Sequence, residues 1–117
     1  MRVAELVAMV VRLQLRKEFK HASFSRNYSD NLIVRCRLSD GTIGWGEGVP
    51  RDYVTGETPQ GALAQLAATP LDDQLHADCT NWADVISLIE GYRPTVLADD
   101  PRGCLANAHR CAVELSL

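Results

Sequence analysis

The stretch GWGEG, which runs from Gly44 to Gly48, has a glycine at every second position. Glycine inside a strand often marks a bulge or a place where another backbone approaches closely. The stretch contains no lysine and does not open a helix, so it lacks the features of a phosphate-binding loop. We therefore expect its glycines to permit a close backbone approach or a bulge. Trp45 and Glu47 share one face of the same strand, and we expect Glu47 to order the following loop by accepting backbone N–H bonds.

Two further strands are predicted before this one. Apolar residues recur at every second position in 2–19 and again in 31–39, as they do in strands. Ser39-Asp40-Gly41 is a tight-turn signal, which joins the second strand to a third over 42–49 in an antiparallel meander. The segment from Lys20 to Asp30 is polar and rich in Ser, Asn and Asp, which predicts a loop. The residues of the first strand expected to share one face are Val7, Met9, Val11, Leu13 and Leu15.

Two capped helices are predicted after the strands. Thr58 suits the N-cap and Pro59 the first position of a helix over 58–69. Asn81 suits the N-cap of a second helix over 81–91. Residues expected to end these two helices are Pro70 and Gly91, and the apolar stripe of the second helix comprises Trp82, Val85, Ile86 and Ile89.

A last helix is predicted over 102–117, starting near Arg102, and its sequence NAHRCAVELSL has almost no polar side. Such a helix should be buried over most of its surface, yet a unit of 117 residues has little left to cover it. No Gly, Pro or basic residue caps the helix, so we expect the end at Leu117 to be a cut and not a natural terminus. Strands followed by helices predict an α+β fold, with a domain over 1–101 whose helices pack on one face of the sheet.

Composition excludes several classes of function. The chain has 12 basic and 15 acidic residues and a net charge of -3, which does not suit a protein that binds nucleic acid. No stretch of about 20 apolar residues is present, so no membrane span is expected. Glu5 interrupts the apolar start of the chain, and no small-residue cleavage site of a signal peptide follows. We therefore expect a cytoplasmic protein.

The cysteines and histidines do not have the spacing of a metal site. None of the four cysteines forms a CxxC pair, and free thiols in a reducing cytoplasm explain them better. A small metal-binding protein stays open as one hypothesis, although no standard ligand spacing supports it. Its candidate ligands are His76, Cys79, Cys104, His109 and Cys111.

Five segments together resemble a known family. They are Leu15–Phe19, His21–Ser23, Asn31–Arg35, Asp40–Glu47 and Arg110–Leu115. In this order and separation, they are similar to the N-terminal capping domain of the enolase superfamily, in its muconate cycloisomerase and mandelate racemase branch. The resemblance covers essentially the whole chain.

The resemblance implies that this chain is part of a larger enzyme. In that family the capping domain closes over its own C-terminal barrel domain, which supplies acid/base lysines and acidic ligands for magnesium. The metal stabilises an enolate formed next to a substrate carboxylate. None of those barrel residues lies in this chain, so we expect no catalytic residue, no metal site and no cofactor here, and no turnover by the chain alone. The parent enzyme would use Mg on a small carboxylate substrate, and a homo-oligomer is possible.

Two capping loops of this family shape substrate specificity and exclude water when they close. The resemblance places the first around Phe19 to Ser29 and the second over Val49 to Gly56. The arginines in these loops are candidates to hold a distal carboxylate, and the aromatic residues are candidates to wall an apolar group. The candidate substrate-facing residues are His21, Phe24, Arg26, Arg51 and Tyr53.

The reaction of the parent is not fixed by these residues. We expect an isomerase or lyase resembling a muconate or chloromuconate cycloisomerase, with a dipeptide epimerase or an o-succinylbenzoate synthase as alternatives. A hypothesis of another class is a standalone, non-catalytic interaction module. It would use the apolar last helix as a partner surface and bury Ala108, Ala112 and Leu115 in an oligomer.

Overall fold

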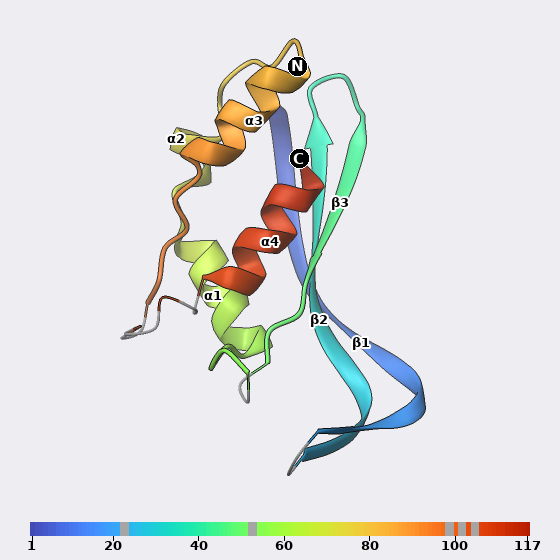
Figure 1. The fold of residues 1–117 in the computed structure, drawn as a ribbon. Helices are drawn as coiled ribbons and strands as arrows, with labels where there is room; N and C mark the ends of the chain where they lie inside the picture. The colour runs from blue at the N-terminus through green and yellow to red at the C-terminus, as the bar shows by residue number, and fades with distance from the viewer. Residues whose placement is uncertain (22–23, 52–53, 98–99, 101–102, 104–105) are drawn as a thin grey trace.

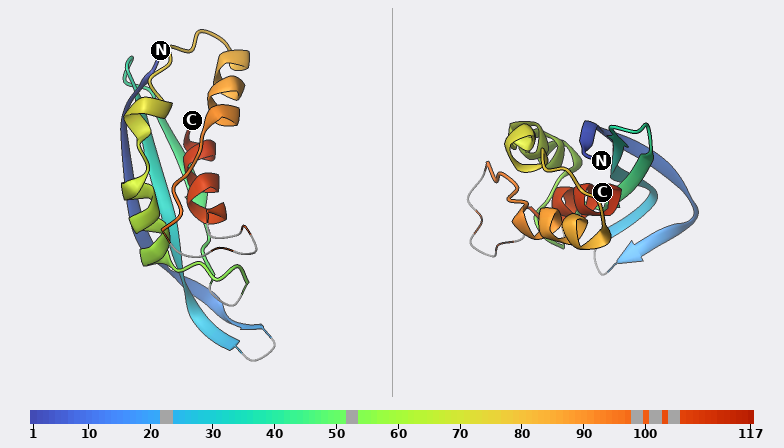
Figure 2. Two further views of the ribbon diagram at one scale, coloured as in Figure 1. Left: turned by 90° about the vertical axis from the view of Figure 1, so that its left-hand side faces the viewer. Right: turned by 90° about the horizontal axis from the view of Figure 1, so that it is seen from above.

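The computed structural model describes residues 1–21, 24–51, 54–97, 100, 103 and 106–117, with the backbone alone for 18–21 and 24–26. The strands come first, as β1 (Val3–His21), β2 (Phe24–Leu38) and β3 (Ile43–Gly48). The helices are α1 (Pro59–Ala68), α2 (Leu71–Gln74), α3 (Trp82–Gly91) and α4 (Asn107–Ser116). The strands form an antiparallel sheet in the order β1-β2-β3, and the helices lie on one of its faces (Figures 1 and 2). The α+β prediction and the three-stranded meander are confirmed.

The hairpin of β1 and β2 is longer than predicted. β1 continues to His21 and β2 already begins at Phe24, so the loop predicted over Lys20 to Asp30 is wrong for most of its length. Its residues pair across the hairpin, with Phe19 opposite Arg26. Backbone pairing does not require apolar side chains, so a polar segment can also form paired strands. Residues 12–21 and 24–30 form a two-stranded arm that projects from the body (Figure 1).

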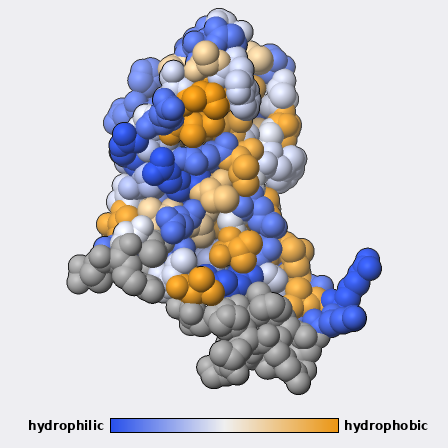
Figure 3. Space-filling view, in the orientation of Figure 1, coloured by the Kyte–Doolittle hydropathy of each residue, from blue (hydrophilic) through white to orange (hydrophobic). Residues whose placement is uncertain are grey.

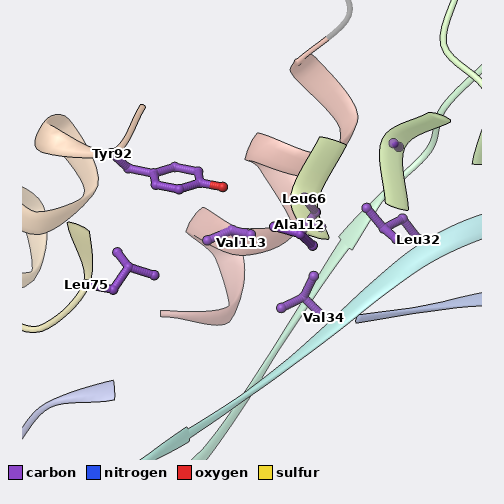
Figure 4. Packing of buried hydrophobic residues seen from close by; sticks show 8 residues of the cluster. Leu32, Val34, Leu66, Leu75, Tyr92, Ala112 and Val113 are labelled. Atoms are coloured by element: carbon purple, nitrogen blue, oxygen red, sulfur yellow. The ribbon is translucent and has the colours of Figure 1, made fainter. Parts of the chain in front are cut away.

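The core lies between the sheet and the helices. The inner face of β2 contributes Leu32 and Val34, both fully buried, and α1 contributes Leu66. Figure 4 shows these side chains together with Ala112 and Val113 of α4, and with Tyr92 at the end of α3. On β1, the residues that pack against this core are Val3, Leu6, Ala8 and Val10. The alternate set that includes Val7, Met9 and Val11 therefore lies on the sheet face turned away from the helices.

The glycines of β3 bring this strand into backbone contact with α4. A Cβ atom at Gly46 would lie only 1.8 Å from the carbonyl oxygen of Ala112. The same construction gives 2.1 Å from Gly44 to the Ser116 oxygen, and 2.0 Å from Gly48 to the Ala108 oxygen. Three residues spaced by four along α4 thus face three glycines spaced by two along β3. The predicted close backbone approach is confirmed.

Packing against the rest of the domain also buries one side of the helix predicted to lack a cover, while Leu115 on its other side stays exposed. In α4 the buried residues are Ala108, His109, Ala112, Val113 and Ser116. The helix begins at Asn107 and not near Arg102, because Gly103 has a left-handed φ of 67° that a helix does not accommodate. Residues 101–102 and 104–105 lie outside the described part of the chain.

The two predicted helix N-caps, Thr58 and Asn81, are confirmed. The Thr58 hydroxyl accepts a hydrogen bond from the Gly61 N–H at 3.0 Å, and the Asn81 side chain accepts one from the Asp84 N–H at 3.0 Å. Pro70 follows α1 and precedes the short helix α2, which was not predicted. The apolar stripe of α3 lies largely outside the core, and Trp82 is 71% exposed.

We predict that Gly46→Ala destabilises the fold by about 3 kcal/mol, because the added methyl group overlaps a helix carbonyl that cannot move independently. Gly91→Ala is the matched control, since a Cβ there meets no atom within 4 Å and its φ is not left-handed. We expect Gly91→Ala to be neutral or stabilising by up to about 1 kcal/mol. Urea unfolding of both variants measures the difference. Equal midpoints would contradict the proposed strand–helix contact.

We also predict an acid-sensitive stability that depends on His109. Burial of this fully enclosed imidazole lowers its pKa below the ordinary 6.5. Below pH 6.5 the His109 imidazole is therefore protonated more readily in the unfolded chain than in the folded chain. The contribution of neutral, buried His109 to the free energy of unfolding is complete above pH 6.5, and it decreases as the pH falls towards the lower pKa of the folded state. Urea unfolding at about pH 7.5 and about pH 5.5 should show this loss in the wild type and a smaller one in His109→Leu. The exposed His76→Gln variant should keep the wild-type loss.

Candidate functional site

Three parts of the fold meet at one end of the molecule. They are the base of the arm, the loop between β3 and α1, and the N-terminal end of α4 (Figure 1). Of the two segments predicted as specificity loops, Phe19 to Ser29 lies on the arm outward from its base, and Val49 to Gly56 belongs to the β3–α1 loop. Hydrogen bonds between side chains and backbone connect all three parts, and these contacts define the candidate site.

Arg51 joins the loop to the arm. Its Nη1 donates to the carbonyl oxygens of Asp30 at 3.0 Å and Pro50 at 2.7 Å. Its Nη2 donates to the Asn31 Oδ1 at 3.1 Å and to the Ser29 hydroxyl. Asp30, Ser29 and Asn31 belong to β2 at the point where the arm leaves the body. The guanidinium thus binds acceptors of two separate segments.

The acceptors of Arg51 continue into β3. Ser29 and Asn31 are both buried, and the Ser29 hydroxyl donates to the Asn31 Oδ1 at 2.5 Å. The Asn31 Nδ2 then donates to the Glu47 Oε2 at 3.2 Å. The described contact of the Glu47 carboxylate is therefore with a side chain of β2. It is not with the backbone of the following loop, as the sequence suggested.

A backbone N–H is instead bound by another carboxylate, that of Glu57, and this N–H belongs to α4. The Glu57 carboxylate is buried, and its Oε2 accepts a hydrogen bond from the Ala108 N–H at 2.8 Å. Its Oε1 accepts one from the Thr55 hydroxyl at 2.7 Å. A carboxylate at the start of a helix satisfies a free N–H group and interacts favourably with the helix dipole. Sequence reasoning missed Glu57 because its partner is 51 residues away and no local pattern signals it.

The arm carries an internal ion pair at its base. The Arg12 guanidinium donates twice to the Asp30 carboxylate, at 2.8 and 2.9 Å, and lies 3.9 Å from the centre of the Tyr28 ring. The hydrogen bond from Arg12 lowers the pKa of Asp30 below its ordinary value. The arm contains five of the 12 basic and two of the 15 acidic residues, a net charge of +3, so the rest of the chain has -6. The arm is thus a basic extension of an acidic body.

The structure places the five predicted substrate-facing residues as follows. His21 and Phe24 pair with each other across the arm at the last described position before residues 22–23, and Arg26 pairs with Phe19. Tyr53 lies outside the described residues. Arg51 makes the contacts given above. Direct contact of any of the five with a substrate stays a prediction.

Among the described residues, no group of three or more His, Cys, Asp or Glu side chains is placed to hold a metal ion. Cys104, one of the candidate ligands, is outside the described part. None of the described helices is both long and apolar enough to cross a membrane.

An apolar groove lies between α3 and α4, on the face shown in Figure 3. Its lining includes Trp82, Ile89 and Leu115, and Leu115 is 64% exposed. The interaction-module hypothesis required Ala108 and Ala112 to face a partner. Both are already buried against β3, so that surface is reduced to Leu115 and its neighbours.

Curated relatives of the chain are epimerases and racemases, and no family model matches it. An aromatic dipeptide epimerase of Herpetosiphon aurantiacus is 27% identical over 115 residues, which are 98% of this chain and 29% of that protein. An N-succinyl-L-Arg/Lys racemase of Bacillus cereus is 33% identical over 69 residues, 59% of this chain and 19% of that protein. The chain thus spans less than a third of the length of the curated relatives it matches.

The chain is also similar to solved structures of epimerases and of a mandelate racemase/muconate lactonizing protein. The L-Ala-D/L-Glu epimerase of Bacillus subtilis aligns over 99% of this chain and 30% of its own, with a TM-score of 0.72 and 20% identity, which supports the fold alone. A mandelate racemase/muconate lactonizing protein from Herpetosiphon aurantiacus has a TM-score of 0.70 and 28% identity over 98% of this chain and 29% of its own. A dipeptide epimerase from Methylococcus capsulatus, complexed with Mg and the dipeptide L-Arg-D-Lys, has a TM-score of 0.63 and 28% identity. The alignment covers 77% of this chain and 25% of that protein.

We predict that Glu57→Ala lowers the free energy of unfolding by about 1–3 kcal/mol, because the buried Ala108 N–H loses its acceptor. Glu57→Gln keeps an acceptor oxygen and should cost less. Glu90→Ala, on the exposed side of α3, is the control and should change stability by no more than about 0.5 kcal/mol. Thermal unfolding of the three variants measures the order. An equal effect of Glu57→Ala and Glu90→Ala would contradict the capping role.

Proposed function

We propose that this chain, which has the fold and sequence of the N-terminal capping domain of the enolase superfamily, is the substrate-specificity domain of a dipeptide epimerase. The main support for this proposal is the match to an aromatic dipeptide epimerase over 98% of the chain. It favours the alternative reading over the muconate or chloromuconate cycloisomerase expected from the sequence. The parent would invert a stereocentre next to a carbonyl group of a dipeptide or a related amino-acid derivative.

The chemistry of this reaction would reside in the second domain of the parent. Magnesium, bound there, would stabilise the enolate that forms when a base removes the α-proton. A dipeptide epimerase among the similar structures is complexed with Mg and a dipeptide, which supports this cofactor for the parent. Within the present chain we propose binding and exclusion of water, and no proton transfer.

The arm and the β3–α1 loop would act on the part of the substrate away from the reacting carbon. The basic charge of the arm suits an anionic group, and Arg26 is our candidate to hold it through paired hydrogen bonds. Phe24 and Tyr53 are candidates to wall an apolar side chain of the dipeptide. His21 completes the set at the end of the arm. Closure of both segments over the substrate would remove water from the reacting centre.

The experiment is performed on the full-length parent protein. We expect exchange of the dipeptide α-proton for deuterium in D₂O, no conversion of muconate, and no exchange with the 117-residue chain alone. Exchange catalysed by this chain alone, or a parent that converts muconate and leaves dipeptides unchanged, would overturn the proposal.

We further predict that Tyr53→Ala and Arg26→Ala in the parent change the ratio of kcat/KM between an acidic and an apolar dipeptide by about tenfold, equivalent to about 1.4 kcal/mol. Their unfolding midpoints should stay near that of the wild type, because the proposal assigns both side chains to the substrate and not to the core. Arg37→Ala, at the other end of the sheet, is the control and should leave the ratio unchanged. Unfolding of both site variants would show that these residues are structural.

A further inference from the structure

We propose that Arg51 is a positioning residue that couples the arm to the β3–α1 loop, so that the two segments keep one relative placement. The sequence presented Arg51 as a residue facing the substrate. Its described hydrogen bonds assign it a different task, which is to join two segments of the protein to each other. The consequence for substrate preference rests on the proposed function, whereas the coupling itself does not.

The geometry of the Arg51 contacts requires a guanidinium. Nη1 and Nη2 together donate to two carbonyl oxygens and two side chains. The two carbonyl oxygens belong to different segments, because Asp30 lies at the base of the arm and Pro50 lies in the loop. A planar group with donors in a fixed fork holds such acceptors in one arrangement. Lysine carries the same charge on a single rotating ammonium group, so it cannot reproduce this arrangement.

The acceptors on the arm side are themselves held in place. Ser29 and Asn31 are 7% and 5% exposed, and they are bonded to each other. Asn31 is bonded in turn to Glu47 of β3. Removal of one member of a buried polar network leaves the remaining groups without partners, so the cost spreads through the network. A change at Arg51 is therefore transmitted to the base of the arm.

The loop side is fixed at a second point. The N–H of Thr55 donates to the Arg51 carbonyl oxygen at 3.0 Å, and the Thr55 hydroxyl donates to Glu57. Glu57 then accepts from the N-terminal end of α4. The loop thus extends from the arm base at Arg51 to the helix at Glu57. A two-stranded ribbon has little stability of its own, so the placement of the arm depends on contacts at its base.

Hydrogen exchange of the chain tests the coupling without any need for activity. We expect Arg51→Lys to speed exchange of amides in both the arm and the β3–α1 loop by about tenfold, with α1 and α3 unchanged. Ser29→Ala keeps the arginine and removes one acceptor, so it should give a smaller change in the same two segments. It also serves if Arg51→Lys fails to fold.

Arg12→Met is the matched control. Like Arg51, Arg12 forms hydrogen bonds with Asp30, but it binds the carboxylate and both residues belong to the arm. Arg12 has no described hydrogen bond to the β3–α1 loop. This variant should speed exchange in the arm alone. Unchanged loop amides in both Arg51→Lys and Ser29→Ala would overturn the inference, and so would equal loosening of the loop in Arg12→Met.

Kinetics of the parent separate positioning from mere stability. If the arm and the loop are coupled, the effects of Phe24→Ala and Tyr53→Ala on the ratio of kcat/KM between dipeptides should be non-additive. In the Arg51→Lys background the same effects should become additive. Effects that add in both backgrounds would refute the coupling while leaving a dipeptide epimerase intact. A parent without activity on dipeptides, whose amides respond as expected, would refute the proposed function and leave the coupling.

Discussion

The contact between the backbones of β3 and α4 is the constraint on which the rest of this structure depends. A side chain at Gly44, Gly46 or Gly48 would overlap a helix carbonyl group, so this face of the strand can carry no side chain larger than that of glycine. The helix presents Ala108, Ala112 and Ser116 at these points, and small residues permit the approach. Because the packing is fixed by backbone and not by flexible side chains, it leaves α4 little freedom to rotate or slide.

This packing determines the geometry of the candidate site. With α4 held against β3, its N-terminal end is presented to the Glu57 carboxylate, which closes one side of the β3–α1 loop. Arg51 closes the other side on the base of the arm. The order of dependence thus runs from a strand–helix contact to a helix cap, to a loop, and then to the arm. The packed part of the domain supplies the frame, and under the proposed function the projecting segments would supply the surface that meets a ligand.

Local signals in the sequence predicted the elements that depend on neighbouring residues. Thr58 and Asn81 cap helices within three positions of themselves, so their pattern is visible without the fold. Contacts between distant residues were not visible, and the Glu57–Ala108 bond is the clearest example. The arm was misread because its Ser and Asn residues favour turns, whereas pairing across a hairpin satisfies the same backbone. The alternation in β1 did not reveal which apolar set is inside, because both sets are apolar.

The same distinction explains why the sequence resembles a superfamily without indicating one reaction. The segments that carry the resemblance include Gly44 and Gly46 of β3 and the Ala112–Val113 part of α4, which are packing residues. A contact between packing residues carries no information about a particular reaction. Under the proposed function, substrate choice would depend instead on the arm and the β3–α1 loop. The basic arm of the acidic body could then accept a different ligand through changes at a few of its positions, while the strand–helix contact stays as it is.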